Sequence, residues 1–148
     1  MTENTRSSTG LRRTLFAFLA GFGATLLAHQ PVLALLHGAG LVPRAAYNFS
    51  PVPPFGVPSV ISLSFWGGVW GVIMIWALSR VRPGAVWWIA SAVFGAVLPT
   101  LVAATVVMPL KGLHVAPEQR MSMLAIGLLV NAAWGLGTAL LYRLFVRP

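Results

Sequence analysis

Residues 15–36 read LFAFLAGFGATLLAHQPVLALL, a run that contains no Lys, Arg, Asp or Glu. An α-helix rises about 1.5 Å per residue, so a run of this length can cross a hydrocarbon core about 30 Å thick. Three further uncharged apolar runs follow at about residues 60–78, 85–107 and 121–141. The sequence therefore predicts an all-α membrane protein, a four-helix bundle with four transmembrane helices.

The overall composition supports a lipid environment. The chain has 148 residues, of which 57% are hydrophobic and 8% are charged, whereas a soluble domain has about 25% charged residues. Twelve charged side chains, ten basic and two acidic, are too few to cover a soluble surface. The runs are apolar on every face, which excludes the alternating pattern of a transmembrane barrel strand. The lipid bilayer is therefore the first partner that we expect.

The basic residues indicate the orientation. The net charge of +8 does not predict a nucleic-acid partner, because the basic residues lie in short clusters between the apolar runs. Seven of them fall on one side of the predicted membrane: Arg6, Arg12, Arg13, Arg80, Arg82, Arg143 and Arg147. Three fall on the other: Arg44, Lys111 and Arg120. The positive-inside rule then places both termini in the cytoplasm, which corresponds to a bacterial inner (cytoplasmic) membrane protein with N-in, C-in topology.

Two segments are predicted along the chain. Residues 1–14 are polar and are expected to form a disordered cytoplasmic N-terminus, and residues 15–148 a single transmembrane domain. An alternative is a signal peptide, with Arg12–Arg13 preceding an apolar core and cleavage after Ala28. The apolar character resumes at once in residues 32–36, which favours a retained first helix.

The first outer loop, at residues 37–59, is rich in proline, and its prolines exclude a continuous helix or a central strand: Pro43, Pro51, Pro53, Pro54 and Pro58. Apolar residues interleave with these prolines. We expect either a lid that folds over the outer end of the bundle or an ordinary loop at the level of the lipid head groups.

Small residues predict where the helices pack. Gly67 and Gly71 form a GxxxG step, and Gly127 and Gly135 lie on one stripe of the fourth helix. Such residues let helix backbones approach closely in a membrane. Internal packing is the favoured interpretation, and contacts in a homo-oligomer are the alternative.

Two prolines predict helix kinks, Pro31 in the first span and Pro99 in the third. Pro31 should disturb the carbonyl four residues back, that of Leu27. Asn131 lies near the middle of the fourth span, where a carboxamide that faced lipid would lose its hydrogen bonds. It should point inward, either to a backbone carbonyl freed by a proline or to the polar floor of a cavity.

The residues His29, Gln30, His37 and His114 converge on the predicted outer end. Several uses are open, and no cofactor is identified. His37 and His114 form the one pair that could ligate haem, and the three histidines could bind a metal ion. His29, Gln30 and Asn131 could form a proton relay or a quinone pocket. The alternative is structural: these side chains satisfy the broken helix or rest at the head groups.

The chain contains few of the residue types that commonly carry out catalysis. There is no cysteine, and the two carboxylates, Glu3 and Glu118, lie outside the apolar runs. Paired-carboxylate and triad mechanisms are therefore not expected, and no catalytic residue is assigned. The favoured function is a structural or accessory subunit that docks on a larger membrane complex. The alternatives are an oligomeric small-solute transporter or channel, and a quinone-, haem- or metal-binding redox protein.

The segments PPFGVPSVISLSFWGGVWG at 53–71 and LPTLVAATVVMPLKG at 98–112, together with HQPVLALLH at 29–37, carry a resemblance. They are similar to an uncharacterised group of small four-helix bacterial inner-membrane proteins. The resemblance implies the fold and the location, and it implies no activity.

Overall fold

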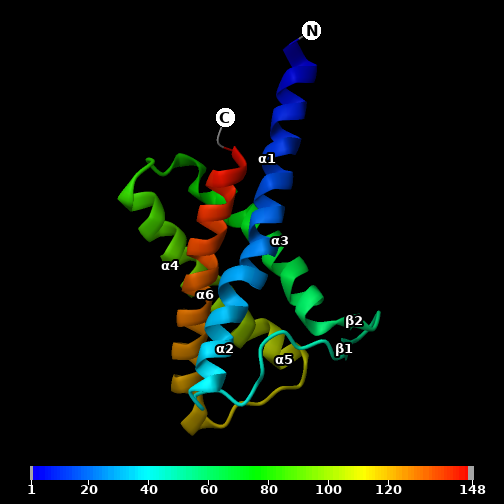
Figure 1. Ribbon diagram of the computed structural model, residues 1–148, viewed down its shortest axis with the longest axis vertical. Coiled ribbons are helices and arrows are strands. Elements are labelled where there is room, and N and C mark those ends of the chain that lie inside the picture. The colour runs from blue at the N-terminus through cyan, green and yellow to red at the C-terminus, as the bar shows by residue number, and fades with distance from the viewer. Residues whose placement is uncertain (1, 147–148) are drawn as a thin grey trace.

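The computed structural model of the protein describes residues 2–146, and Figure 1 shows its path. It is mostly helical, at 78%. The helical elements are α1 (Thr2–Ala24), the π-helical turn η1 (Thr25–His29), α2 (Gln30–Gly38), α3 (Ser59–Ala77), the 3-10 turn η2 (Leu78–Arg80), α4 (Ala85–Val102), a second π-helical turn η3 (Ala103–Val107), α5 (Met108–Leu110) and α6 (Pro117–Val146). The two short strands are β1 (Pro51–Val52) and β2 (Val57–Pro58).

Four helical segments are long and apolar enough to cross a membrane: Gly10–Gly38, Ser59–Arg80, Ala85–Leu110 and Pro117–Val146. Each contains one of the predicted spans and extends it at one or both ends. The prediction of four helices with the length and hydropathy of membrane spans is thus confirmed. The start of α1 and the end of α6 lie at the same end of the bundle in Figure 1.

In the described structure α1 begins at Thr2, within the segment 1–14 for which the sequence predicts disorder. A helix that is already nucleated by packing can extend backward at little cost, since each added residue gains one hydrogen bond. The first turns of α1 project beyond the other helices in Figure 1. Residues 1, 147 and 148, which the predicted segments 1–14 and 15–148 include, lie outside the described residues.

The helices pack with α1 and α6 at the centre. α3 lies against α1, α4 lies against α6, and α3 and α4 contact each other little. Within that small contact, the Trp70 and Phe94 rings have centroids 6.2 Å apart. The core contains two clusters, one around Met74 and Trp134 and one around Ala20 and Tyr142. The main helices are therefore arranged in the order α3, α1, α6, α4, in which α1 and α6 are neighbours although they are far apart in the sequence.

Glycines allow two close helix crossings. At the α1–α3 crossing, a Cβ atom at Gly21 would overlap the carbonyl oxygen of Gly67, and one at Gly71 would lie 2.6 Å from the Ala17 oxygen. At the α4–α6 crossing, a Cβ at Gly135 would overlap the Ser91 oxygen. Backbones can approach this closely only where no side chain intervenes.

The predicted packing glycines all face a neighbouring helix within this chain. Gly67 and Gly71 lie on the α3 surface that contacts α1, and Gly135 lies on the α6 surface that contacts α4. Gly127, about two turns before Gly135 on α6, faces the side chain of Thr100. The small residues therefore have an internal role.

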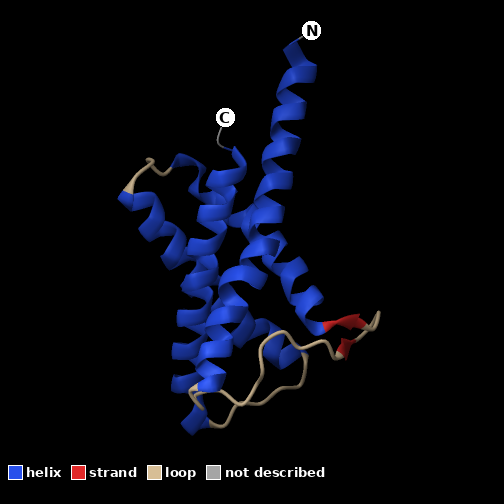
Figure 2. Ribbon diagram, viewed as in Figure 1, coloured by secondary structure: helices blue, strands red, loops and turns tan. Residues whose placement is uncertain are grey.

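The outer loop is a strap rather than a lid. Its residues 39–50 lead from the end of α2 to β1, and the β1–β2 hairpin, which precedes α3, projects to the side of the bundle (Figure 2). Ser59 donates its backbone N–H to Ser50, and Val60 donates to Asn48, which ties the strap to the first turn of α3. The hairpin tip is open, since Phe55 is 87% exposed.

Candidate functional site

The break in the first span is a π-helical turn. The backbone N–H of Gln30 donates to Thr25, five residues back, instead of to the α-helical partner four residues back. In this register the carbonyl of Leu26 would need the N–H of Pro31, which proline lacks. Widening a helix by one residue is a recognised way to accommodate a proline ring.

The same arrangement occurs in the third span, but at a different proline. Met108 donates to Ala103 in η3, and Pro109 follows directly. Pro99, the predicted kink position, lies inside α4 with no change of helix type there. The span predicted from the sequence ends at residue 107, so Pro109 lies beyond it and is not among the predicted kinks.

Gln30 and Tyr47 anchor the strap to the break. The Gln30 side chain is 3% exposed, and its Oε1 accepts a hydrogen bond of 2.7 Å from the backbone N–H of Tyr47. The Tyr47 hydroxyl donates to the Leu26 carbonyl at 2.8 Å. One residue of the outer loop thus pairs with both the carboxamide oxygen of Gln30 and the carbonyl that Pro31 leaves free.

The three histidines have three different environments. His29 lies in η1, and its Nδ1 is buried with no hydrogen-bond partner among the described residues. His37 closes the end of α2 through a 2.9 Å hydrogen bond between its Nδ1 and the Val42 carbonyl. His114 lies in the second outer loop, the connection between α5 and α6 at residues 111–116, beside a cavity. In the described part of the chain, no three His, Cys, Asp or Glu residues are grouped so that they could hold a metal ion.

Asn131 pairs with a side chain rather than with a freed backbone carbonyl. Its Nδ2 donates to the Oγ1 of Thr100 at 2.9 Å, and Thr100 is buried on α4 directly after Pro99. A hydroxyl can accept this bond while its own hydrogen remains available. The pair joins α4 to α6 close to the Thr100–Gly127 contact.

The same pair lies on the wall of a cavity of about 460 Å³ between α4, η3, α5 and α6. His114 and Arg120 are its other hydrogen-bonding side chains, and Met108, Leu113 and Met123 are among its apolar ones. Of the five predicted site residues, His114 and Asn131 line this cavity, and His29, Gln30 and His37 do not.

Two residues of the site were not singled out from the sequence. These residues are Thr100 and Tyr47. Threonine is common in membrane helices and tyrosine in interfacial loops, and neither residue belongs to a motif. A weak signal existed for Thr100, because a hydroxyl next to a proline within a span is a candidate partner for freed polar groups. No comparable signal identified Tyr47.

The chain matches no known protein-family model, no curated protein and no solved structure.

Proposed function

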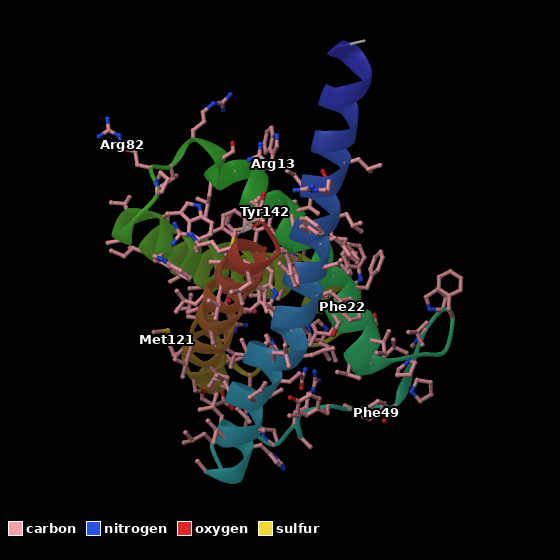
Figure 3. The ribbon with its side chains drawn as sticks, turned by 45° about the horizontal axis from the view of Figure 1, so that its top comes forward. Arg13, Phe22, Phe49, Arg82, Met121 and Tyr142 are labelled. Atoms are coloured by element: carbon pink, nitrogen blue, oxygen red, sulfur yellow. The ribbon has the colours of Figure 1, made fainter. Side chains whose placement is uncertain are left out.

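We propose that this chain is a multi-pass protein of the bacterial inner membrane with both termini in the cytoplasm. Four helices with the length and hydropathy of membrane spans support the multi-pass assignment. The excess of arginine near the terminus-bearing end, illustrated by Arg13 and Arg82 in Figure 3, supports the orientation. Phe49 lies toward the opposite end in the same view.

Within that membrane, its role is that of a structural or accessory subunit of a larger complex. The observation that carries this proposal is the use of the polar side chains. Gln30 accepts from Tyr47, His37 bonds to Val42, and Asn131 donates to Thr100. Three of the five candidate residues therefore hold the fold together, as intramembrane polar groups must when no water is present.

The helix crossings add a second support. Gly21, Gly67 and Gly71 interlock backbone against backbone, and the indole N–H of Trp134 donates to the Gly21 carbonyl at 3.0 Å. Alternating access in a transporter requires one group of helices to rock against another. Crossings without intervening side chains, joined by a buried hydrogen bond, favour a rigid scaffold.

Photocrosslinking in the native membrane tests this role. A photoreactive residue is placed singly at three exposed positions on different helices: Trp66 of α3, Leu101 of α4 and Leu129 of α6. A docked subunit predicts a protein adduct from one face and lipid adducts from the others. An adduct of about twice the 15.8 kDa chain mass would indicate a second copy instead. Lipid adducts alone at all three positions would refute docking.

A second candidate function is the binding of a small molecule with a polar head, such as a quinone, in the cavity between α4, η3, α5 and α6. The volume of this cavity, about 460 Å³, falls in the usual range for ligand sites, about 300–1,000 Å³. His114 and Asn131 both line it, and each can donate a hydrogen bond to a carbonyl oxygen.

Native mass spectrometry with an absorption spectrum separates the two candidates. A bound small molecule should be lost from the His114→Ala variant and kept by His37→Ala, because His37 lies outside the cavity. Protein extracted gently from its own membrane without any small-molecule mass would exclude this second function.

A further inference from the structure

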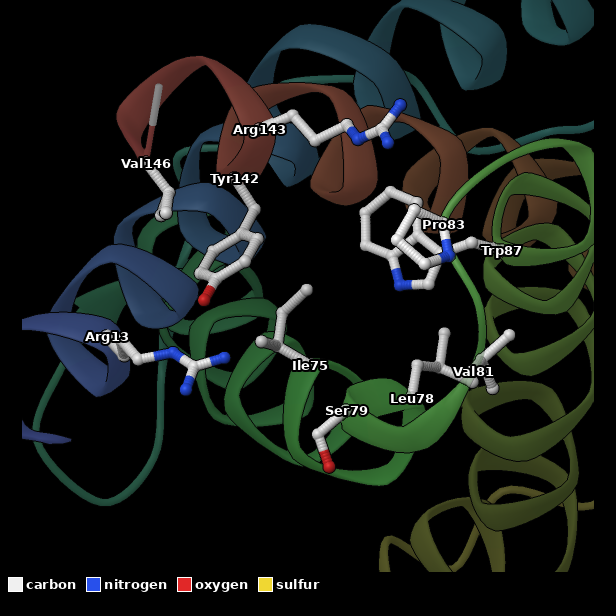
Figure 4. Close-up of a pocket in the computed structure, with 10 residues that line it drawn as sticks. All are labelled: Arg13, Ile75, Leu78, Ser79, Val81, Pro83, Trp87, Tyr142, Arg143 and Val146. Atoms are coloured by element: carbon white, nitrogen blue, oxygen red, sulfur yellow. The ribbon is translucent and has the colours of Figure 1, made fainter. Parts of the chain in front are cut away.

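A second cavity, of about 510 Å³, lies at the end of the bundle that carries both termini (Figure 4). All four spanning segments contribute to its wall. α1 provides Arg13, α3 provides Ile75, α4 provides Trp87, and α6 provides Tyr142 and Arg143. It therefore lies between the ends of the four helices and the short α3–α4 connection.

Two arginines give this cavity its charge. In Figure 4 the Arg13 guanidinium extends toward the middle of the cavity from one side, and Arg143 lies on another side near Trp87. The Arg143 Cζ atom is 5.1 Å from the centroid of the Trp87 ring and 5.4 Å from that of Trp88. Stacking on aromatic faces orients a guanidinium and leaves the N–H groups at its edge free to donate.

No carboxylate is among the described residues that line the cavity. Glu118, the acidic residue whose side chain is described, begins α6 at the opposite end of that helix. Among the described residues, no side chain that lines the cavity neutralises these two positive charges. In a partly desolvated site, an uncompensated charge favours a ligand of opposite sign.

Tyr142 adds an unsatisfied donor. The residue is 8% exposed, it lines the cavity, and its hydroxyl is buried without a hydrogen-bond partner among the described residues. A buried hydroxyl without a partner is unfavourable. The hydroxyl is covered in this structure, so a phosphate oxygen in the cavity reaches it after a small shift of the tyrosine ring, and the new hydrogen bond would then remove this cost.

We propose that this cavity binds the phosphate of an anionic phospholipid head group. Arg13 and Arg143 supply charge and hydrogen bonds, and the Tyr142 hydroxyl donates to a phosphate oxygen. Guanidinium groups match phosphate geometry, and basic pockets between membrane helices commonly hold lipid head groups. Free phosphate offers the same chemistry. The apolar part of the wall, including Ile75, Leu78 and Val146, favours the lipid, whose glycerol and first methylene groups need an apolar surface.

The proposal requires that the four helices span a bilayer. It does not depend on the accessory-subunit role, because a lipid can fill this cavity whether or not another protein is docked.

The test uses the full chain, freed of lipid in detergent and analysed by native mass spectrometry. Phosphatidylglycerol, phosphatidylcholine and inorganic phosphate are added separately. The native protein should retain phosphatidylglycerol at least about tenfold better than zwitterionic phosphatidylcholine, because only the former has net negative charge. Inorganic phosphate alone should bind weakly, because it lacks the apolar part.

Two double variants provide a matched comparison. Arg13→Gln with Arg143→Gln should weaken phosphatidylglycerol binding by about tenfold or more. Arg80→Gln with Arg82→Gln removes the same charge near the same end but from residues that do not line the cavity, and it should bind as the native protein does. Equal losses in the two variants would indicate general attraction to the surface and overturn the site.

Tyr142→Phe separates ligand binding from folding. Removal of an unpaired hydroxyl should leave the lipid-free melting temperature unchanged or slightly raised, and should weaken phosphatidylglycerol binding by about three- to tenfold. Unchanged lipid binding in this variant would contradict the role of Tyr142. Arginine-dependent binding of inorganic phosphate without retention of phosphatidylglycerol would overturn the lipid assignment in favour of free phosphate.

Discussion

The Tyr47 hydroxyl donates a 2.8 Å hydrogen bond to the backbone carbonyl of Leu26, the carbonyl that Pro31 leaves without a donor in the π register. A loop residue thus completes a helix that the sequence interrupts. Because the backbone N–H of Tyr47 also donates to Gln30, the proline-rich strap and the helix break stabilise each other.

Tyr47→Phe tests this relationship. The variant keeps the ring and the backbone bond to Gln30 but removes a hydrogen bond that lies at the exposed surface, so the free energy of unfolding should fall by about 0.5–1.5 kcal/mol. The measurement is thermal unfolding in detergent, followed by tryptophan fluorescence. Phe55→Leu, at the exposed hairpin tip, is the control and should change stability by less than about 0.5 kcal/mol. Equal stability of Tyr47→Phe and the native protein would show that water satisfies the carbonyl.

Gln30→Leu should release the strap while leaving the helices in place. The buried acceptor for the Tyr47 N–H is lost, so residues 39–50 should open more often. Limited trypsin digestion measures this at Arg44, which lies in the strap. Cleavage after Lys111, in the second outer loop, is an internal control. Faster cleavage at both sites would mean that the variant unfolds as a whole.

Gly21→Ala should destabilise the bundle more than a typical surface change. The new Cβ would overlap the Gly67 carbonyl and displace α3 from α1. Overpacking of this kind costs about 1–3 kcal/mol. Gly38→Ala, in the last turn of α2, meets no atom within 4 Å and should be neutral or slightly stabilising. The comparison of their melting temperatures in detergent is decisive, and a Gly21→Ala variant as stable as Gly38→Ala would refute the close crossing.

Asn131 and Thr100 should be energetically coupled. In a double-mutant cycle with Asn131→Ala and Thr100→Val, the two changes should be non-additive by about 0.6 kcal/mol, and by up to about 1.7 kcal/mol. Unfolding by a denaturing detergent measures each variant. Ser122, also on α6, bonds locally to Gln119, so Ser122→Ala combined with Thr100→Val should be additive. Additivity of the Asn131 pair would mean that their hydrogen bond contributes nothing to stability.

The proposed topology has a direct test. A reporter enzyme that is active only in the periplasm should be inactive when fused after Pro148. The same reporter should be active when it is inserted after Gly112 in the second outer loop, because the arginine distribution places that loop outside. Activity of the fusion after Pro148 would reverse the orientation.

The sequence alone determined where the spans lie, because a run of about 20 uncharged apolar residues has few other folds available in water or in lipid. It also identified Gly67, Gly71, Gly127 and Gly135 as residues that face other helices. It did not identify which carbonyl Pro31 frees, since an α-helical register points to Leu27 and the π turn shifts the unpaired group to Leu26.

The tertiary structure decided which polar groups meet. Hydropathy is summed over a run and is the same for every rotation of a helix about its axis. Whether Asn131 reaches Thr100, or Trp134 reaches Gly21, depends on that rotation and on which helices are neighbours. The strap, likewise, brings Tyr47 to Leu26 only because its path crosses the first span on the way to α3. Contacts between residues far apart in sequence arise from packing, and no local pattern encodes them.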